Sequence, residues 1–134
     1  MLPSHTRPLA RLALLSFLLT FVAARGMSLL MRVHRMSGLY LHFHGTHIHH
    51  LNYGIFLLAG VGAYLLFHPG PPVPAAAVVY GIGLALTFDE FGMWLHLDGD
   101  YWQRTSFDAV IVLTALLGLA SFAPSLRRLQ SLGR

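Results

Sequence analysis

Cysteine and lysine are absent from this sequence of 134 residues, and acidic residues number only 5. The absence of cysteine excludes disulfide bonds, thiolate metal ligands and thiol nucleophiles. Charged residues make up 10% of the chain and hydrophobic residues 55%, whereas a soluble domain carries about 25% charge. Such a chain cannot cover a water-facing surface. This composition argues against a soluble enzyme, a disordered protein and a nucleic-acid binder, and the length suits one domain.

Long apolar runs dominate what is present. A membrane-spanning helix needs about 20 mostly apolar residues, and four stretches meet that condition, with Pro69-Gly70-Pro71-Pro72 separating the second from the third. The sequence therefore predicts an all-α fold, a four-transmembrane-helix bundle that forms a single integral membrane domain over residues 1–134. The predicted helices cover roughly 8–31, 47–67, 74–97 and 106–123, with a histidine-rich loop over 32–46.

The arginines predict the orientation of this bundle. Four helices place both termini on the same side, and that side carries Arg7, Arg11, Arg127, Arg128 and Arg134, against four arginines and all five acids on the other. An excess of arginine marks the cytoplasmic side, so we expect cytoplasmic termini and an outward histidine-rich loop. An alternative is that residues 1–24 form a cleaved signal peptide, because Val22-Ala23-Ala24 resembles a signal-peptidase site.

Histidine is concentrated in one segment. Five of the nine histidines fall within residues 42–50, namely His42, His44, His47, His49 and His50. His47 and His50 are three residues apart, so at the start of a helix they would share one face. Imidazole is a ligand for zinc, copper, iron and nickel. The cluster predicts a metal site, with a hydrogen-bonded lattice of histidines at the membrane surface as the alternative.

The third predicted helix carries acids. Ala77, Gly81, Ala85 and Asp89 recur every four residues, and small residues at that spacing let another helix approach closely. Asp89 continues this stripe, so it is expected to point into the bundle, with Glu90 about 100° further round the helix. Acids inside a membrane span are costly and usually functional. His96 follows Asp89 by seven residues and would share roughly the same face.

These two motifs are expected to converge on one pocket. The predicted metal ligands are His47, His50, Asp89 and His96, followed by His49, His44 and His42 as further candidate ligands. Glu90 is the predicted catalytic base. The ion would be a divalent transition metal, zinc or iron. Arg25 lies at nearly the same predicted depth as Glu90, so it is a candidate counter-ion that would neutralise one acid without metal.

The motifs also carry a resemblance. The segments HFHGTHIHH, GIGLALTFDEFGMWLHLDGDYW and TSFDAV, within residues 36–112, resemble an uncharacterised family of small bacterial integral membrane proteins. That resemblance implies a four-helix membrane architecture, in a bacterial inner membrane, and implies no reaction.

Three functions are compatible with these motifs. The first is a membrane-embedded metalloenzyme that acts on a lipid or other apolar substrate, with zinc-bound water and a carboxylate base as its chemistry. The second is a metal-ion or proton transporter, which would have to act as a homo-oligomer because four helices leave little room for a pore. The third is a haem-binding or structural subunit of a larger membrane complex. In each case the lipid bilayer is the expected surrounding, and nucleic acid is not an expected partner.

Overall fold

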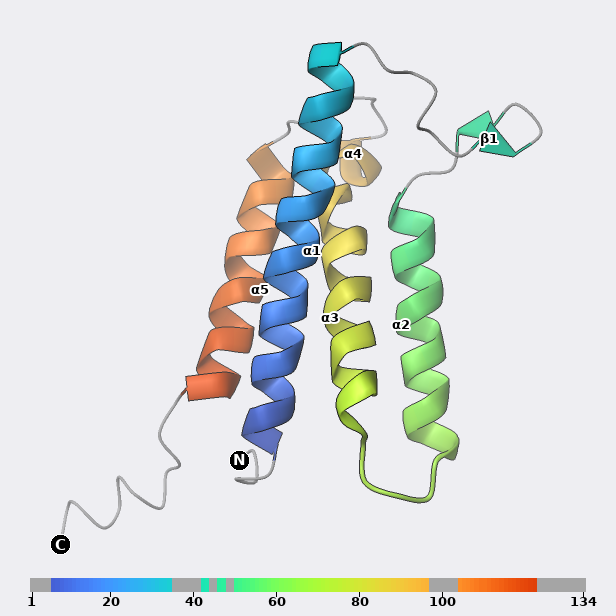
Figure 1. Ribbon diagram of the computed structural model, residues 1–134, viewed down its shortest axis with the longest axis vertical. Helices are drawn as coiled ribbons and strands as arrows, with labels where there is room; N and C mark the ends of the chain where they lie inside the picture. The colour runs from blue at the N-terminus through green and yellow to red at the C-terminus, as the bar shows by residue number, and fades with distance from the viewer. Residues whose placement is uncertain (1–5, 35–41, 44–45, 48–49, 97–103, 123–134) are drawn as a thin grey trace, which may run out of the picture.

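The computed structural model describes residues 6–34, 42–43, 46–47, 50–96 and 104–122. Its elements are α1 (Thr6–His34), β1 (His42–Phe43), β2 (Thr46–His47), α2 (His50–Phe67), α3 (Pro74–Asp89), α4 (Phe91–His96) and α5 (Arg104–Phe122). The four long helices α1, α2, α3 and α5 lie side by side as a bundle, and the start of α1 and the end of α5 lie at the same end (Figure 1). The predicted four-helix architecture is confirmed.

Three of these helices are long and apolar enough to cross a membrane: α1, α2 and α5. The fourth, α3, is also apolar but has only 16 residues. The outer surfaces of the bundle are apolar, as the exposure of Phe56, Leu66 and Phe67 illustrates. Large apolar side chains face outward in this way when hydrocarbon, and not water, surrounds the protein. The chain is therefore a membrane protein by its structure as well as by its composition.

The helix α3 lies at the centre of the bundle. It packs against α1 on one side and α2 on the other, while α5 packs mainly against α1. The buried core residues Phe17, Leu84, Ala85 and Val110 come from α1, α3 and α5. Because α3 touches every other long helix, residues at its ends are well placed to join distant parts of the chain.

Glycines set how closely α3 approaches its neighbours. A Cβ atom at Gly81 would collide with the Ser16 hydroxyl and the Ala13 carbonyl oxygen of α1. A Cβ atom at Gly54 of α2 would lie 2.6 Å from the Thr87 backbone nitrogen of α3. Both distances are shorter than real side chains tolerate, so these helices meet backbone to backbone. The predicted role of the small-residue stripe in helix packing is confirmed.

The predicted third helix, 74–97, is wrong in its extent. The α-helix ends at Asp89, and Glu90 (φ −101°, ψ 10°) leaves the helical conformation before α4 begins at Phe91. The predicted start of the second helix at His47 also differs, since His47 lies in β2, opposite His42 of β1 in an antiparallel pair, and α2 begins at His50. The helix α1 starts two residues before and ends three residues after its predicted bounds, and α5 starts two residues before its predicted start and ends one residue before its predicted end.

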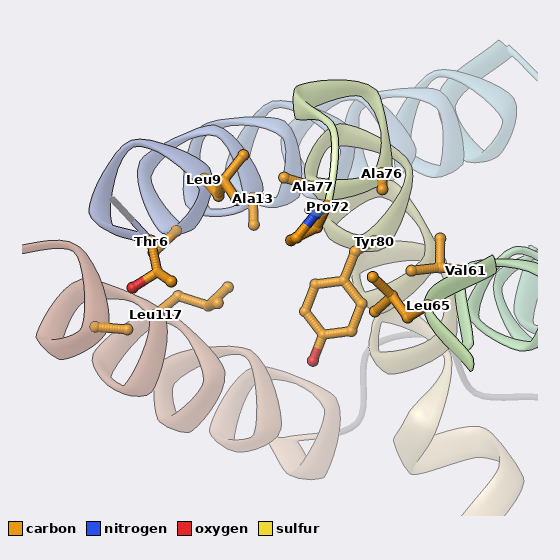
Figure 2. A pocket seen from close by; sticks show the side chains of 12 residues that line it. Thr6, Leu9, Ala13, Val61, Leu65, Pro72, Ala76, Ala77, Tyr80 and Leu117 are labelled. Carbon is orange, nitrogen blue, oxygen red and sulfur yellow. The ribbon is translucent and has the colours of Figure 1, made fainter. Parts of the chain in front are cut away.

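An apolar cavity of about 470 Å³ lies among the long helices (Figure 2). Its walls come from the start of α1, the end of α2, the start of α3 and the end of α5. The cavity is therefore at the end of the bundle opposite Asp89 and Glu90.

Candidate functional site

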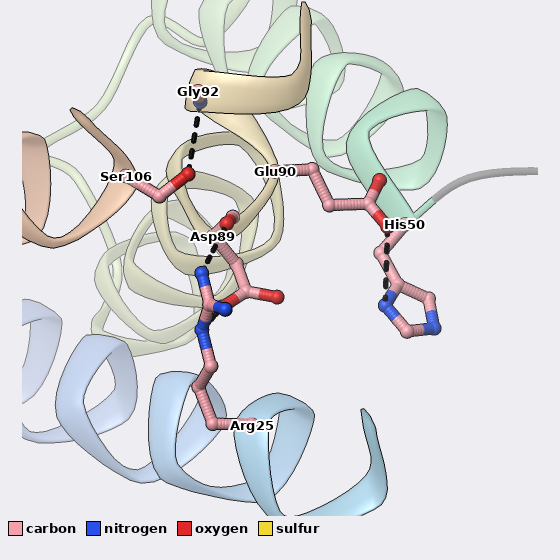
Figure 3. Close-up of polar contacts among 6 residues, drawn as sticks. All are labelled: Arg25, His50, Asp89, Glu90, Gly92 and Ser106. Carbon is pink, nitrogen blue, oxygen red and sulfur yellow. Dashed lines mark hydrogen bonds and ion pairs between the residues drawn. The ribbon is translucent and has the colours of Figure 1, made fainter. Parts of the chain in front are cut away.

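The junction between α3 and α4 gathers polar side chains from the rest of the bundle (Figure 3). Asp89 and Glu90 are each 1% exposed, although no long apolar helix easily buries two adjacent acids. Arg25 of α1, His50 of α2 and Ser106 of α5 all reach this junction. Four helices therefore meet at one short polar segment, which we call the α3–α4 junction and define as residues 89–92.

Arg25 satisfies Asp89 twice. Its Nε atom lies 2.6 Å from the Asp89 carboxylate Oδ1, and its Nη2 donates a hydrogen bond of 2.6 Å to the Asp89 backbone oxygen. Asp89 is the last residue of α3, where carbonyl groups lack helical partners and the helix dipole is negative. The Arg25 guanidinium thus neutralises the Asp89 carboxylate and also caps the C-terminal end of α3. The predicted pairing of Arg25 with one of the acids involves Asp89.

Aromatic rings enclose the Arg25 guanidinium. Its Cζ atom lies 4.7 Å from the Phe107 ring centroid and 5.6 Å from that of Phe21, and the two rings contact each other edge to face at 6.3 Å. Cations over aromatic faces gain electrostatic stabilisation, most when they are desolvated. These contacts hold the guanidinium in the apolar interior and fix its position between α1 and α5.

Glu90 caps a different helix. Its Oε2 atom accepts a hydrogen bond of 3.0 Å from the backbone nitrogen of Leu51, in the first turn of α2. The first N–H groups of a helix lack partners within the helix, and a carboxylate there is favoured by the positive end of the dipole. A glutamate that follows α3 therefore supplies the capping oxygen for α2, across a sequence separation of 39 residues.

His50 faces the other oxygen of the same carboxylate. Its Nδ1 atom lies 3.8 Å from Glu90 Oε1, too far for a hydrogen bond. The Nδ1 atom is buried and has no hydrogen-bond partner among the described residues, while the side chain as a whole is 31% exposed. The imidazole therefore presents a buried nitrogen toward the acid and part of its surface to the outside.

Ser106 ties α4 to α5. Ser106 is 1% exposed, and its hydroxyl oxygen accepts a hydrogen bond of 2.8 Å from the backbone nitrogen of Gly92. This bond satisfies an N–H group at the point where α3 has already ended, so it helps the chain to break at Glu90. The sequence does not predict this contact between Ser106 and Gly92. Ser106 lies near the predicted start of the last helix, where a serine usually caps its own helix.

The structure brings together only part of the predicted metal site. His50, Asp89, Glu90 and Arg25 lie at the junction, as Figure 3 shows. His47 and His42 lie in β2 and β1, and His96 is the last residue of α4, but their side chains lie outside the described part of the chain. His44 and His49 lie outside the described residues altogether.

Two geometric premises of that prediction are wrong. His47 and His50 do not share a helix face, because β pairing with His42 holds His47 outside α2. His96 does not continue the helical face of Asp89, because the helix is interrupted at Glu90. Among the described residues, no group of three or more His, Asp or Glu side chains is arranged to hold a metal ion. The described part of the site contributes a pair of potential ligands, Glu90 and His50.

No protein-family model, curated protein or solved structure matches this chain in comparisons with known proteins. The resemblance to an uncharacterised family of bacterial membrane proteins therefore stays a prediction.

Proposed function

We propose that the protein is a transition-metal-binding integral membrane protein whose site is built on Glu90 and His50. The observation that supports this proposal most directly is the pair of atoms Glu90 Oε1 and His50 Nδ1, which lie 3.8 Å apart with Nδ1 buried and without a described hydrogen-bond partner. Buried polar atoms normally have partners. A cation bound by both atoms would supply one.

The spacing is close to that of a shared ion. Zinc bonds to carboxylate oxygen and imidazole nitrogen are about 2.0–2.2 Å long, so two ligand atoms of one tetrahedral ion lie about 3.4 Å apart. The 3.8 Å separation is slightly longer, so the partly exposed His50 side chain would move slightly toward Glu90 to bind the same ion. Asp89 is a weaker candidate than Glu90, because Arg25 already neutralises its carboxylate at 2.6 Å.

Zinc and iron sites in proteins need more than two protein ligands. The further ligands in this proposal are histidines of the segment that leads directly into α2, with His49 adjacent to His50 in sequence and His47 two residues before it. His96 is a further candidate, since α4 starts immediately after Glu90. Zinc or iron is the proposed cofactor, on the chemistry of imidazole and carboxylate ligands.

A metal at this place would make the protein a candidate metalloenzyme for a lipid or other apolar substrate. A zinc ion supplies a hydroxide nucleophile at neutral pH. The site lies where a bundle with apolar outer surfaces ends, so a substrate could reach it from the bilayer. Incubating metal-loaded and chelated protein with a membrane lipid extract tests this step. Metal-dependent loss of one lipid class, measured by mass spectrometry, is the expected result, and identical lipid profiles would count against catalysis.

A cation path through a single chain has less support. The described core next to the site is Phe17, Leu84, Ala85 and Val110. The hydroxyls of Thr87, Thr114 and Ser121 are bonded to carbonyls of their own helices at 2.6–2.7 Å, so they do not line a polar route. A transported ion needs polar groups on both halves of the membrane.

Elemental analysis of the purified protein tests the metal proposal. We expect a stoichiometric amount of zinc or iron in the wild type and loss of most of it in Glu90→Gln and His50→Ala. The Gln variant keeps an oxygen that can accept the Leu51 hydrogen bond, so it removes the charged ligand with little cost to the fold. His68→Ala, on an exposed residue just beyond the other end of α2, serves as the matched control. A wild type that neither contains nor takes up metal, or variants that retain it, would overturn the proposal.

For the location we propose a bacterial inner membrane, with the ends of the chain in the cytoplasm and the histidine-rich segment outside. The excess of arginine on the side of the termini supports this orientation. The end of the bundle that carries the start of α1 and the end of α5 would then be cytoplasmic, and the α3–α4 junction would be at the outer end.

A further inference from the structure

The apolar cavity lies far from the Glu90–His50 pair and has its own chemistry. Its walls include Leu9 and Ala13 of α1, Leu65 of α2, Ala77 and Tyr80 of α3, and Ala120 of α5. The Tyr80 ring stands among these side chains (Figure 2). From Tyr80 to Asp89 the distance along α3 is about 13 Å, at 1.5 Å per residue, so the cavity and the junction are separate sites.

The contents of this cavity are constrained by its surroundings. Its lining is almost entirely hydrocarbon, with Thr6 and Tyr80 as the polar exceptions. At about 470 Å³ it lies within the range of about 300–1,000 Å³ that small-molecule sites occupy. It is bounded by helices that span a membrane, where the molecules available at high concentration are lipids. A flexible acyl chain therefore fits both the lining and the location.

The same end of the bundle is positively charged. Arg7 and Arg11 lie in the first two turns of α1 and follow the cavity residues Thr6 and Ala10 directly in sequence. Arg11 also bridges to the end of α5, where its Nε atom donates to the Ser121 oxygen at 3.4 Å and its Cζ atom lies 5.0 Å from the Phe122 ring centroid.

No acidic side chain offsets these arginines among the described residues at this end. Asp89 and Glu90 lie at the opposite end of α3, and Asp108 lies in the first turns of α5, which start at that same opposite end. This end of the protein therefore carries net positive charge, and basic sites between membrane helices attract anionic lipid headgroups.

We propose that the cavity binds one acyl chain of an anionic phospholipid, whose phosphate lies against Arg7 and Arg11. The apolar lining selects the chain and the two guanidinium groups select the headgroup charge. A zwitterionic lipid offers the same chain with no net charge, and a fatty acid offers a carboxylate in place of the phosphate. The site requires no metal, so this proposal stands whether or not Glu90 and His50 bind one.

Lipid retention by the full-length protein tests the proposal. The protein is reconstituted in nanodiscs that contain phosphatidylglycerol and phosphatidylcholine in equal amounts, purified in detergent and analysed by native mass spectrometry. We expect the wild type to keep phosphatidylglycerol in preference to phosphatidylcholine. Ala120→Leu fills the cavity and should lose the bound lipid of either class. Ala115→Leu places the same side chain on an exposed face of α5, away from the cavity, and should retain it.

The charge requirement is tested separately. Arg7→Gln combined with Arg11→Gln should abolish the preference for phosphatidylglycerol while some lipid remains bound. Arg104→Gln, an exposed arginine at the opposite end, should keep the preference. Circular dichroism verifies that each variant is folded. If Ala120→Leu fails to fold, Ala77→Val replaces it as the cavity-filling variant. Equal retention in the filled variant and Ala115→Leu, or no lipid on the wild type, would refute the proposal, as would retention of fatty acid alone.

Discussion

Glu90, the residue directly after α3, accepts a hydrogen bond of 3.0 Å from the backbone nitrogen of Leu51 in the first turn of α2. The residue that follows one helix therefore supplies, through its buried carboxylate, the cap of another. The adjacent Asp89 is held by Arg25, and the following Gly92 by Ser106. Each of the other long helices contributes at least one contact, so the α3–α4 junction joins the bundle at one end.

The capping role of Glu90 predicts different effects for two substitutions in metal-free protein. Glu90→Ala leaves the Leu51 N–H without its acceptor, and loss of a helix cap costs about 0.5–2 kcal/mol of unfolding free energy. Glu90→Gln keeps an acceptor oxygen and should cost less. Unfolding in detergent with a chelator present measures both, and hydrogen exchange at Leu51 should accelerate most in the Ala variant. Equal losses would argue that the carboxylate charge, and not the cap, stabilises the fold.

The pairing of Arg25 with Asp89 predicts strong coupling between two substitutions. Arg25→Met leaves the Asp89 carboxylate buried without its partner, and breaking a buried pair in this way costs about 3–5 kcal/mol. Adding Asp89→Asn removes that charge and should recover a large part of the loss. A double-mutant cycle in unfolding free energy provides the measurement. Additive losses would show that the two side chains are not coupled.

The close contact of α2 with α3 predicts opposite results at two glycines of α2. Gly54→Ala places a Cβ atom 2.6 Å from the Thr87 nitrogen, so α2 must move away, and overpacking of this kind costs about 1–3 kcal/mol. Gly60→Ala meets nothing within 4 Å and should be neutral or slightly stabilising, because alanine favours helix. Thermal unfolding of both variants compares them directly. A tolerated Gly54→Ala would contradict the backbone contact.

Two buried serines on α5 predict unequal losses. Ser106→Ala leaves the buried Gly92 N–H without an acceptor, which costs about 1–3 kcal/mol. Ser121 is buried as well, but its hydroxyl donates to the Leu117 oxygen within its own helix. Ser121→Ala should therefore cost less. The unfolding free energies of the two variants are compared. A larger loss of unfolding free energy in Ser121→Ala than in Ser106→Ala would contradict the role of Ser106 in holding α4.

The proposed orientation predicts the labelling of single cysteines, which are simple to introduce because the chain has none. Leu95 on α4 is 54% exposed. Leu95→Cys should react with a membrane-impermeant maleimide in spheroplasts, in which the outer membrane has been removed and the inner membrane is intact. Pro71→Cys, in the exposed turn between α2 and α3, should react only after the inner membrane is permeabilised. The reverse pattern would place the termini outside.

The helices follow from the sequence because hydrophobic length alone decides what can span a bilayer. The close approach of another helix at Gly81 was also predictable, since small residues recur every four positions before Asp89, but the sequence does not show that this helix is α1. The interruption at Glu90 was not predictable. Local sequence there is compatible with a continuous helix, and the groups that favour the break come from α1, α2 and α5, up to 64 residues away. Helix periodicity therefore misplaced His96.

The site could be predicted in its residue types but not in its partnerships. From the sequence, Arg25 was equally able to pair with Asp89 or Glu90. Only the packing of α1 against α3 selects Asp89 as its partner. The helical spacing of His47 and His50 suggested a shared face, whereas pairing of His42 with His47 places His47 in a strand. The alternation of His42 and His44 with Leu41 and Phe43 indicates an extended segment, but it does not show which residues that segment pairs with.

The central position of α3 has a consequence for the order of assembly in the cell. The two helices made first, α1 and α2, both pack on α3, which separates them. During synthesis Arg25 therefore enters the bilayer 64 residues before Asp89, its partner, is translated. A lone guanidinium in hydrocarbon is unfavourable, so α1 should stay at the insertion machinery, or partly outside the lipid, until the third helix emerges. Late arrival of one carboxylate would then time the release of the first helix into the membrane.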